Sequence, residues 1–113
     1  MSGVHALVLH GSRARGDAGA SSDWDFGVLG DGDVDLAALS AALTRLLGTD
    51  AVDVVDLRRA SALLRYRAAR DGVVIVERRD ETFRDFALEA VRFWCDAGPV
   101  IRAAQDDVLA GLE

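Results

Sequence analysis

Four short apolar runs, separated by segments with helical periodicity, place the strongest constraint on how this chain can fold. The runs are Val4–Leu9, Asp23–Leu29, Ala51–Leu57 and Val73–Glu77. Runs of this length and composition favour β-strands. Because strands alternate with helices along the chain, we predict an α+β fold, an α/β sandwich with a small mixed sheet of about four strands covered by helices.

Helical patterns fill the segments between these runs. Asp35–Leu47 places its leucines at helical spacing and ends before Gly48, a residue type that commonly terminates helices. Ala60–Asp71 follows the same pattern. After the first run, Ser12 has the side chain of a helix N-cap, so a short helix is expected through the arginines that follow.

From Glu81 onward the chain is expected to be a C-terminal helical segment, residues 80–113, with a break or kink at Gly98-Pro99. Its apolar stripe comprises Phe83, Phe86, Ala87, Ala90, Val91 and Trp94, widened by Leu88 and Phe93. The stripe either packs on the sheet, which we favour, or presents a surface to a partner. Cys95 lies in the same pattern and is expected to be a small buried hydrophobe.

Length and charge limit the class of protein. With 113 residues and no linker, residues 1–113 are expected to form a single domain. No window is apolar enough for a membrane span and no signal peptide is recognisable, and the lone cysteine suits a reducing, cytoplasmic location. The net charge of −6 argues against general nucleic-acid binding and suits a metal site or a basic partner.

Asp23 and Asp25 place two carboxylates in the second apolar run. Residues i and i+2 of a strand point to one face, so both would project together while Trp24 and Phe26 face the covering helices. Two carboxylates 4 Å apart repel by about 4 kcal/mol at an effective dielectric near 20. A divalent cation such as Mg²⁺ or Mn²⁺ would offset that repulsion. The alternative is a strand entrance where both acids lie in solvent.

A third carboxylate can come from the run at residues 51–57. Asp53 and Asp56 lie three residues apart, so a strand sends them to opposite faces and only one can join the pair. We favour Asp53, because it is flanked by valines in mid-strand, whereas solvent would explain Asp56 at the strand end. Three converging carboxylates can hold two Mg²⁺ ions, the arrangement used for in-line phosphoryl displacement.

The turn after the first run has the character of an anion site. Gly11 permits a tight turn in which backbone N–H groups approach an anion, and the Ser12 hydroxyl can donate to a phosphate oxygen. Arg13 and Arg15 add positive charge, although either could be solvated. A P-loop is excluded, because Asp17 stands where that motif requires lysine.

Together these residues read G-S-x10-D-x-D, followed by an apolar-Asp-apolar strand. This combination resembles the polymerase-β-type nucleotidyltransferase superfamily, in particular the minimal nucleotidyltransferases that serve as MntA-like antitoxins of HEPN/MNT toxin–antitoxin systems. The resemblance covers residues 4 to about 77 and implies a polymerase-β-like fold. The chain departs from it at His10, where relatives often have Phe or Tyr. We expect His10 to pack at the strand end, with a nucleotide contact as the alternative.

The resemblance assigns roles to the motif residues. Gly11 and Ser12 would hold the triphosphate of ATP, Asp23 and Asp25 would bind Mg²⁺, and Asp53 would complete the metal site and support the general base. The implied reaction transfers AMP from ATP to a tyrosine of a HepT-like HEPN ribonuclease toxin within a hetero-oligomeric complex, and so neutralises the toxin.

Two other functions stay open. The chain could be a non-catalytic antitoxin that acts by binding and occlusion. It could also be a nucleotidyltransferase acting on a small molecule, although no second domain is evident to form a substrate pocket. Template-directed polymerisation fits least, because the chain is small and acidic.

Overall fold

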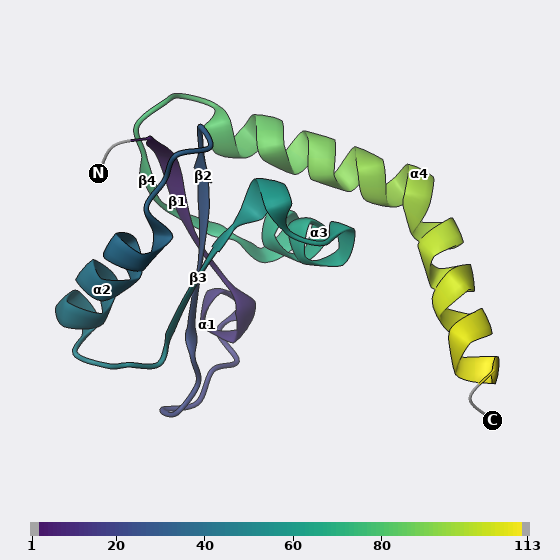
Figure 1. Ribbon diagram of the computed structural model, residues 1–113, viewed down its shortest axis with the longest axis horizontal. Helices are drawn as coiled ribbons and strands as arrows, with labels where there is room; N and C mark the ends of the chain where they lie inside the picture. The colour runs from purple at the N-terminus through teal and green to yellow at the C-terminus, as the bar shows by residue number, and fades with distance from the viewer. Residues whose placement is uncertain (1–2, 112–113) are drawn as a thin grey trace.

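The computed structural model describes residues 3–111 and contains the four expected strands in one sheet (Figure 1). These are β1 (Val4–His10), β2 (Trp24–Gly30), β3 (Val52–Asp56) and β4 (Val73–Glu77). Their order across the sheet is β3-β2-β1-β4. β1 runs antiparallel to both β2 and β4, whereas β2 and β3 are parallel. The predicted mixed sheet of an α+β fold is therefore confirmed.

Helix starts follow the local capping chemistry. The helices are α1 (Gly11–Arg15), α2 (Leu36–Leu47), α3 (Ala62–Asp71) and α4 (Thr82–Gly111), with a 3-10 turn, η1, at Leu57–Arg59. The side chain of Asp35 accepts from the Ala38 N–H at 3.0 Å and that of Ser61 from the Leu64 N–H at 3.1 Å, which are N-caps of α2 and α3.

Two predicted helix starts were wrong. α3 begins two residues later than expected, because the chain first completes η1 and Ser61 then caps the helix. α1 begins at Gly11, after His10, so Ser12 lies inside the helix and is not its N-cap.

The sheet has helices on both faces (Figure 1). On one face α2 packs over Leu7, Phe26 and Val28 with its buried Leu43. Trp24 and Phe26 lie on this face as expected, with stacked rings whose centroids are 6.3 Å apart. On the other face, residues of α3 and α4 pack against the sheet around a second cluster: Ala6, Val8, Leu29, Leu57, Ala68, Phe86 and Ala90. Asp25 of β2 and Asp53 of β3 lie on this second face, near α3.

α4 is longer than its contacts with the sheet require. Pro99 lies inside a continuous helix that bends without a break, and the C-terminal part then extends away from the sheet (Figure 1). Proline lacks an N–H and crowds the preceding turn, which explains the bend. Cys95 is exposed, so its predicted burial was wrong. The physical reason is that α4 continues past the elements that cover its first turns. Among the described residues, no helix combines the length and hydropathy needed to cross a membrane.

Candidate active site

The parallel pairing of β2 and β3 brings two aspartates side by side. Asp25 and Asp53 are direct partners in the register of these strands, and both line a pocket of about 210 Å³ on the α3 face of the sheet. Asp56 lies beside Val28 in the same register, and its side chain instead accepts the Arg58 N–H at 3.0 Å and caps η1. Of the two candidates for a third carboxylate, Asp53 is the one that the structure places with Asp25.

Gly11 closes the pocket at the end of β1. Its φ of +72° lies in the left-handed region, which favours glycine. A Cβ at this position would collide with Oδ2 of Asp25, so the backbone of the turn touches the carboxylate directly. The Gly-Ser turn and Asp25 therefore form one continuous surface, which the sequence spacing alone left open.

His10 precedes this turn and is the register partner of Asp25 across β1 and β2. Its side chain is buried, in agreement with the expected packing role, and it also lines the pocket. Nε2 of His10 is buried and has no hydrogen-bond partner among residues 3–111. The imidazole thus lies beside the aspartates as well as in the strand end, so packing and a contact to bound ligand are compatible here.

The electrostatics of the pocket centre on Asp25. Burial raises the pKa of the Asp25 carboxyl, and the charges of Asp53 and Asp23 raise it further, while His10 and Arg15 act in the opposite direction. The three carboxylates are therefore close enough to repel one another. Hard oxygen donors under mutual repulsion are suited to a divalent cation, so the residues present fit Mg²⁺.

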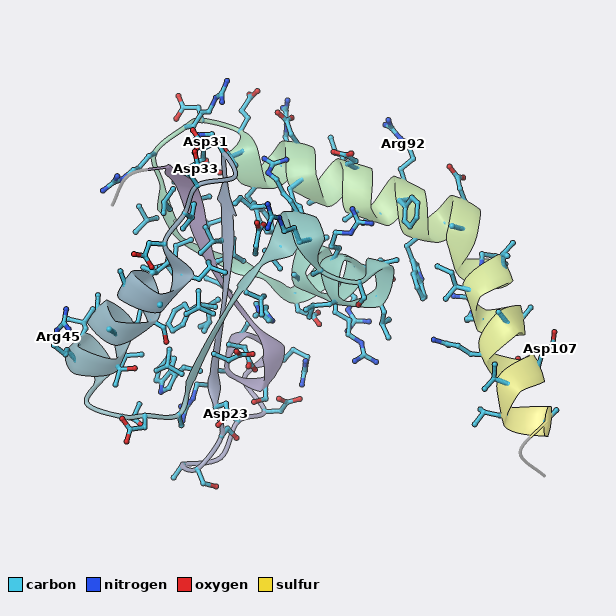
Figure 2. The ribbon with its side chains drawn as sticks, viewed as in Figure 1. Asp23, Asp31, Asp33, Arg45, Arg92 and Asp107 are labelled. Carbon is cyan, nitrogen blue, oxygen red and sulfur yellow. The ribbon has the colours of Figure 1, made fainter. Side chains whose placement is uncertain are left out.

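Asp23 differs in position from the other two aspartates. It lies one residue before β2 begins and is not part of the pocket wall (Figure 2). Asp23 and Asp53 are both exposed, whereas Asp25 is half-buried. Within residues 3–111, no three His, Cys, Asp or Glu side chains are arranged to hold a metal ion. A metal site built from Asp23, Asp25 and Asp53 therefore stays a prediction, and it requires the Asp23 side chain to turn inward.

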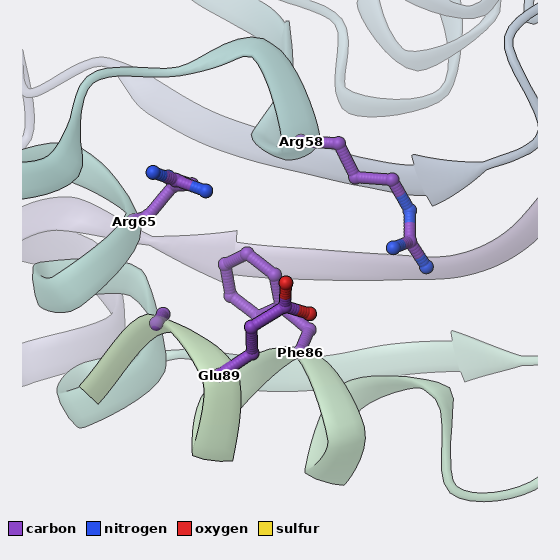
Figure 3. Close-up of a pocket in the computed structure, with 5 residues that line it drawn as sticks. Arg58, Arg65, Phe86 and Glu89 are labelled. Atoms are coloured by element: carbon purple, nitrogen blue, oxygen red, sulfur yellow. The ribbon is translucent and has the colours of Figure 1, made fainter. Parts of the chain in front are cut away.

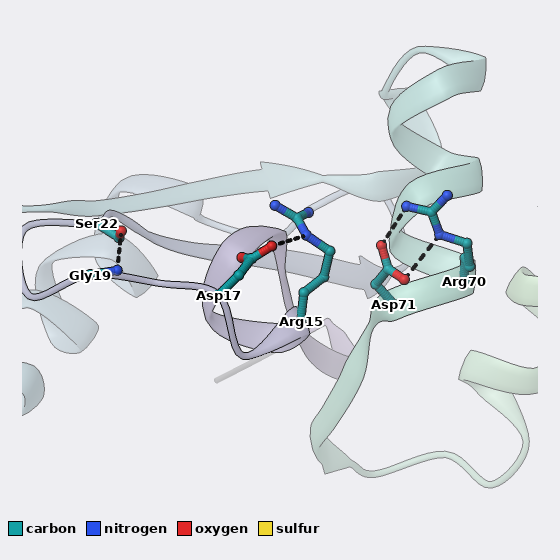
Figure 4. Close-up of polar contacts among 6 residues, drawn as sticks. All are labelled: Arg15, Asp17, Gly19, Ser22, Arg70 and Asp71. Atoms are coloured by element: carbon teal, nitrogen blue, oxygen red, sulfur yellow. Dashed lines mark hydrogen bonds and ion pairs between the residues drawn. The ribbon is translucent and has the colours of Figure 1, made fainter.

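The helical wall of the pocket carries two charged residues, Arg67 and Asp71, that the sequence did not indicate. They line the pocket with Leu64 of α3 and with Arg15 of α1, which was expected at the site. Asp71 accepts two hydrogen bonds from Arg70, at 3.0 and 2.7 Å (Figure 4). Leu64, Arg67 and Asp71 are spaced three and four residues apart, which puts them on one face of α3. That spacing was a usable signal, but nothing in the sequence showed that this face meets the aspartates.

Arg13 is engaged elsewhere. Its guanidinium donates to the Ser22 carbonyl at 2.8 and 3.2 Å and lies 4.1 Å from the centre of the Trp24 ring. The loop is further tied by the Gly19 N–H, which donates to the Ser22 hydroxyl at 2.9 Å (Figure 4). Arg13 therefore holds the loop between the turn and Asp23. Neither Arg13 nor Ser12 lines the pocket, and their predicted phosphate contacts remain predictions.

A second, smaller pocket of about 100 Å³ lies between η1, α3 and α4 (Figure 3). Arg58, Arg65, Phe86 and Glu89 line it, and the Arg65 guanidinium lies 5.1 Å from the Phe93 ring. It contains one carboxylate rather than a pair. This is the packing seam between α3 and α4, and the aspartate pocket is the better candidate for chemistry.

Comparison with known families decides the relationship that the motif suggested. Residues 2–81 match the family described as polymerase beta, nucleotidyltransferase. The chain belongs to this nucleotidyltransferase family. The matched stretch contains the sheet, the Gly-Ser turn and the three aspartates, so the nucleotidyltransferase fold and the candidate site coincide.

The individual relatives of this chain are a protein adenylyltransferase and chains from toxin–antitoxin complexes. It is 38% identical over 92 residues to a protein adenylyltransferase MntA from Aphanizomenon flos-aquae (strain 2012/KM1/D3), a match covering 71% of this chain and 61% of that protein. It therefore spans less than two thirds of the relative's length. A chain in a toxin–antitoxin crystal structure with AMP-PNP has a TM-score of 0.80 and 27% identity, covering 96% of this chain and 89% of that one.

A further structural relative comes from a complex of a tri-AMPylated Shewanella oneidensis HEPN toxin with an MNT antitoxin. The matched chain has 25% identity and a TM-score of 0.74, covering 96% of this nucleotidyltransferase and 86% of that chain. Because so much of the chain is covered, the likeness extends over the sheet and most of α4.

Proposed function

We propose that this nucleotidyltransferase is an Mg²⁺-dependent protein adenylyltransferase and the antitoxin of a HEPN/MNT pair. It transfers AMP from ATP to a tyrosine of a HepT-like HEPN toxin in the cytoplasm, which silences the toxin. The observation that carries this proposal is the pairing of Asp25 with Asp53 in a pocket closed by Gly11. The names of its relatives support the choice of acceptor.

Each residue of the pocket has a different role in the proposed reaction. Asp25 and Asp53, joined by Asp23, would hold Mg²⁺, which when bound neutralises phosphate charge and polarises the phosphoryl group. Asp53 accepts the proton of the incoming tyrosine hydroxyl. The tyrosine oxygen forms a bond to the α-phosphorus while the bond from that phosphorus to the bridging oxygen breaks, and pyrophosphate leaves with that oxygen. Gly11 lets the chain approach the phosphates closely.

The size of the pocket suits the phosphates of ATP rather than the whole nucleotide. At about 210 Å³ the pocket is smaller than the roughly 300–1,000 Å³ typical of sites that enclose a whole ligand. It can take the metal-bound phosphates, with the nucleoside outside. An open site of this kind leaves room for a tyrosine presented by a folded partner.

The test combines the chain with labelled ATP, Mg²⁺ and the HEPN protein encoded beside it. We expect label on a toxin tyrosine and release of pyrophosphate, detected by autoradiography and mass spectrometry. A folded complex that forms without any transfer would contradict the proposal. If, in addition, neutralisation persisted in the Asp25→Ala variant, occlusion would be the function instead.

Occlusion of the toxin is a second candidate function, because α4 presents an apolar surface that could bind the toxin without any chemical reaction. Leu88 is 55% exposed and lies in a groove of about 470 Å³ with Ala87 and Val91, flanked by Arg84 and Arg92. Arg92 points away from the sheet on this side of α4 (Figure 2). We assign the groove to the HEPN toxin, since relatives from toxin–antitoxin complexes match 96% of this chain, including most of α4.

Leu88→Asp is therefore expected to weaken toxin binding by about tenfold or more, because a charge would be buried in an apolar contact. Leu46→Asp is the matched control: Leu46 is 81% exposed on α2, across the sheet from α4. Binding is measured by calorimetry with each folded variant. Equal toxin affinity for the Leu88 variant and wild type would show that this groove is not the contact.

A further inference from the structure

Arg67 is a charged residue of the pocket to which neither the sequence motif nor the comparisons assign a role. It lies on α3, one turn before Asp71, and lines the same pocket as Asp25 and Asp53. The strand side of this pocket carries the Asp25 and Asp53 carboxylates, and the helix side carries Arg15 and Arg67 together with Asp71. A ligand lying between the two sides therefore meets carboxylates on the strand side and, on the helix side, two guanidinium groups with one carboxylate beside them.

Among the described residues, no acid forms an ion pair with Arg67, although the charges of Arg67 and Asp71 attract each other at longer range. Asp71 is bound in a two-bond ion pair by Arg70, and Arg15 pairs with Asp17 at 3.2 Å (Figure 4). The hydrogen bond from Arg70 is also the main cause of the lowered pKa of the Asp71 carboxyl. Over residues 3–111, no carboxylate lies within 4.0 Å of the Arg67 guanidinium.

Arg13, the other arginine that follows the Gly-Ser turn, is not available to bind a ligand in the pocket. Arg13 donates to the Ser22 carbonyl and lies over Trp24, so its charge is directed to the loop. Arg67 is thus the guanidinium that faces the pocket with its hydrogen-bond donors uncommitted among the described residues. Guanidinium groups bind phosphate oxygens through paired donors, a geometry that an ammonium group does not reproduce.

We propose that Arg67 binds the polyphosphate tail of the nucleotide, and that the Arg70–Asp71 ion pair keeps Arg67 free to do so. The inference rests on the proposed function, because it takes a metal-bound nucleoside triphosphate as the ligand. Asp25 and Asp53 hold the cation, and Arg67 contacts oxygens of the β- and γ-phosphates from the opposite wall. Arg70 competes successfully for Asp71, which would otherwise pair with Arg67.

The experiment measures binding of ATP and of AMP to the full chain by calorimetry in excess Mg²⁺, without toxin. For Arg67→Ala we expect ATP affinity to fall about tenfold or more and AMP affinity to change less than about twofold, because AMP lacks the tail. Arg67→Lys should restore part of the ATP affinity. Arg45→Ala is the matched control, since Arg45 is exposed on α2, away from α3 (Figure 2).

A second pair of variants tests the role of Arg70. Arg70→Ala should also weaken ATP binding, because Asp71 is released and can neutralise Arg67. Arg70→Ala/Asp71→Asn should recover it. Thermal unfolding confirms that each variant is folded.

The outcomes separate this inference from the proposed function. If wild type binds ATP and Arg67→Ala binds it equally well, the role of Arg67 is overturned and the proposed function stands. Equal losses of ATP and AMP affinity would also overturn it, since they indicate a general disturbance of the pocket. If wild type does not bind ATP with Mg²⁺, the proposed function fails, and the inference fails with it.

Discussion

Asp25→Asn or Asp53→Asn is expected to lower the rate of AMP transfer by roughly 10²–10⁴-fold, the range for losing a group that handles a proton or developing charge in the transition state. The two side chains are register partners on parallel strands and share one pocket, so neither can be replaced by a neighbour. Asparagine keeps the shape of the side chain and removes the charge that, under the proposed function, would hold the cation. Single-turnover transfer of labelled AMP to the toxin measures the effect.

Asp56→Asn is the matched control on the same strand. Asp56 lies next to Val28 in the register and caps η1, and asparagine caps a helix about as well as aspartate, so the variant should keep close to wild-type stability and leave transfer unchanged. Transfer rates that fell equally in the Asp53 and Asp56 variants would contradict the assignment of the metal site.

The raised pKa of Asp25 leads to a prediction about how the stability of the fold depends on pH. The pKa of Asp25 is raised in the folded chain, so the folded state binds its proton more tightly than the unfolded state does. This contribution to stability is present below the unfolded value, 3.8, and is lost as pH rises through the folded pKa. At pH 7 without metal, Asp25→Asn should therefore be more stable than wild type in urea unfolding. A less stable variant would show that Asp25 is compensated within the fold.

Gly11→Ala is the second large expected effect. At φ +72° an alanine carries a conformational strain of order 1–3 kcal/mol, and its methyl group would collide with Oδ2 of Asp25. We expect both a lower free energy of unfolding and a loss of ATP binding with Mg²⁺, because relief of the collision displaces the carboxylate. Denaturant unfolding and calorimetry measure the two effects separately.

Gly16→Ala separates strain from collision. Gly16 also has a positive φ, +84°, but a Cβ there would meet nothing within 4 Å. The variant should lose stability, by about 1 kcal/mol or more, and keep its affinity for ATP. If both glycine variants bound ATP as wild type does, the contact between the turn and Asp25 would have no part in binding.

Much of the fold was accessible from local patterns in the sequence. The short apolar runs predicted all four strands, and Gly48 together with the leucine spacing predicted α2, because strand and helix preferences act over a few neighbouring residues. The period of two put Trp24 and Phe26 on the face opposite Asp25, and the fold confirms it. The helical pattern of apolar residues did not show where α4 stops packing against the rest of the fold, so the burial of Cys95 was predicted wrongly.

The sequence by itself determined the four strands, α2 and the opposite faces taken by Trp24 and Asp25, because each follows from spacing along a single element. Only the tertiary structure decided which residues meet. The parallel register placed Asp53 rather than Asp56 beside Asp25, and the packing of α3 brought Arg67 to the same pocket. Register and helix placement depend on burial summed over contacts distant in the sequence, so no local spacing encodes them.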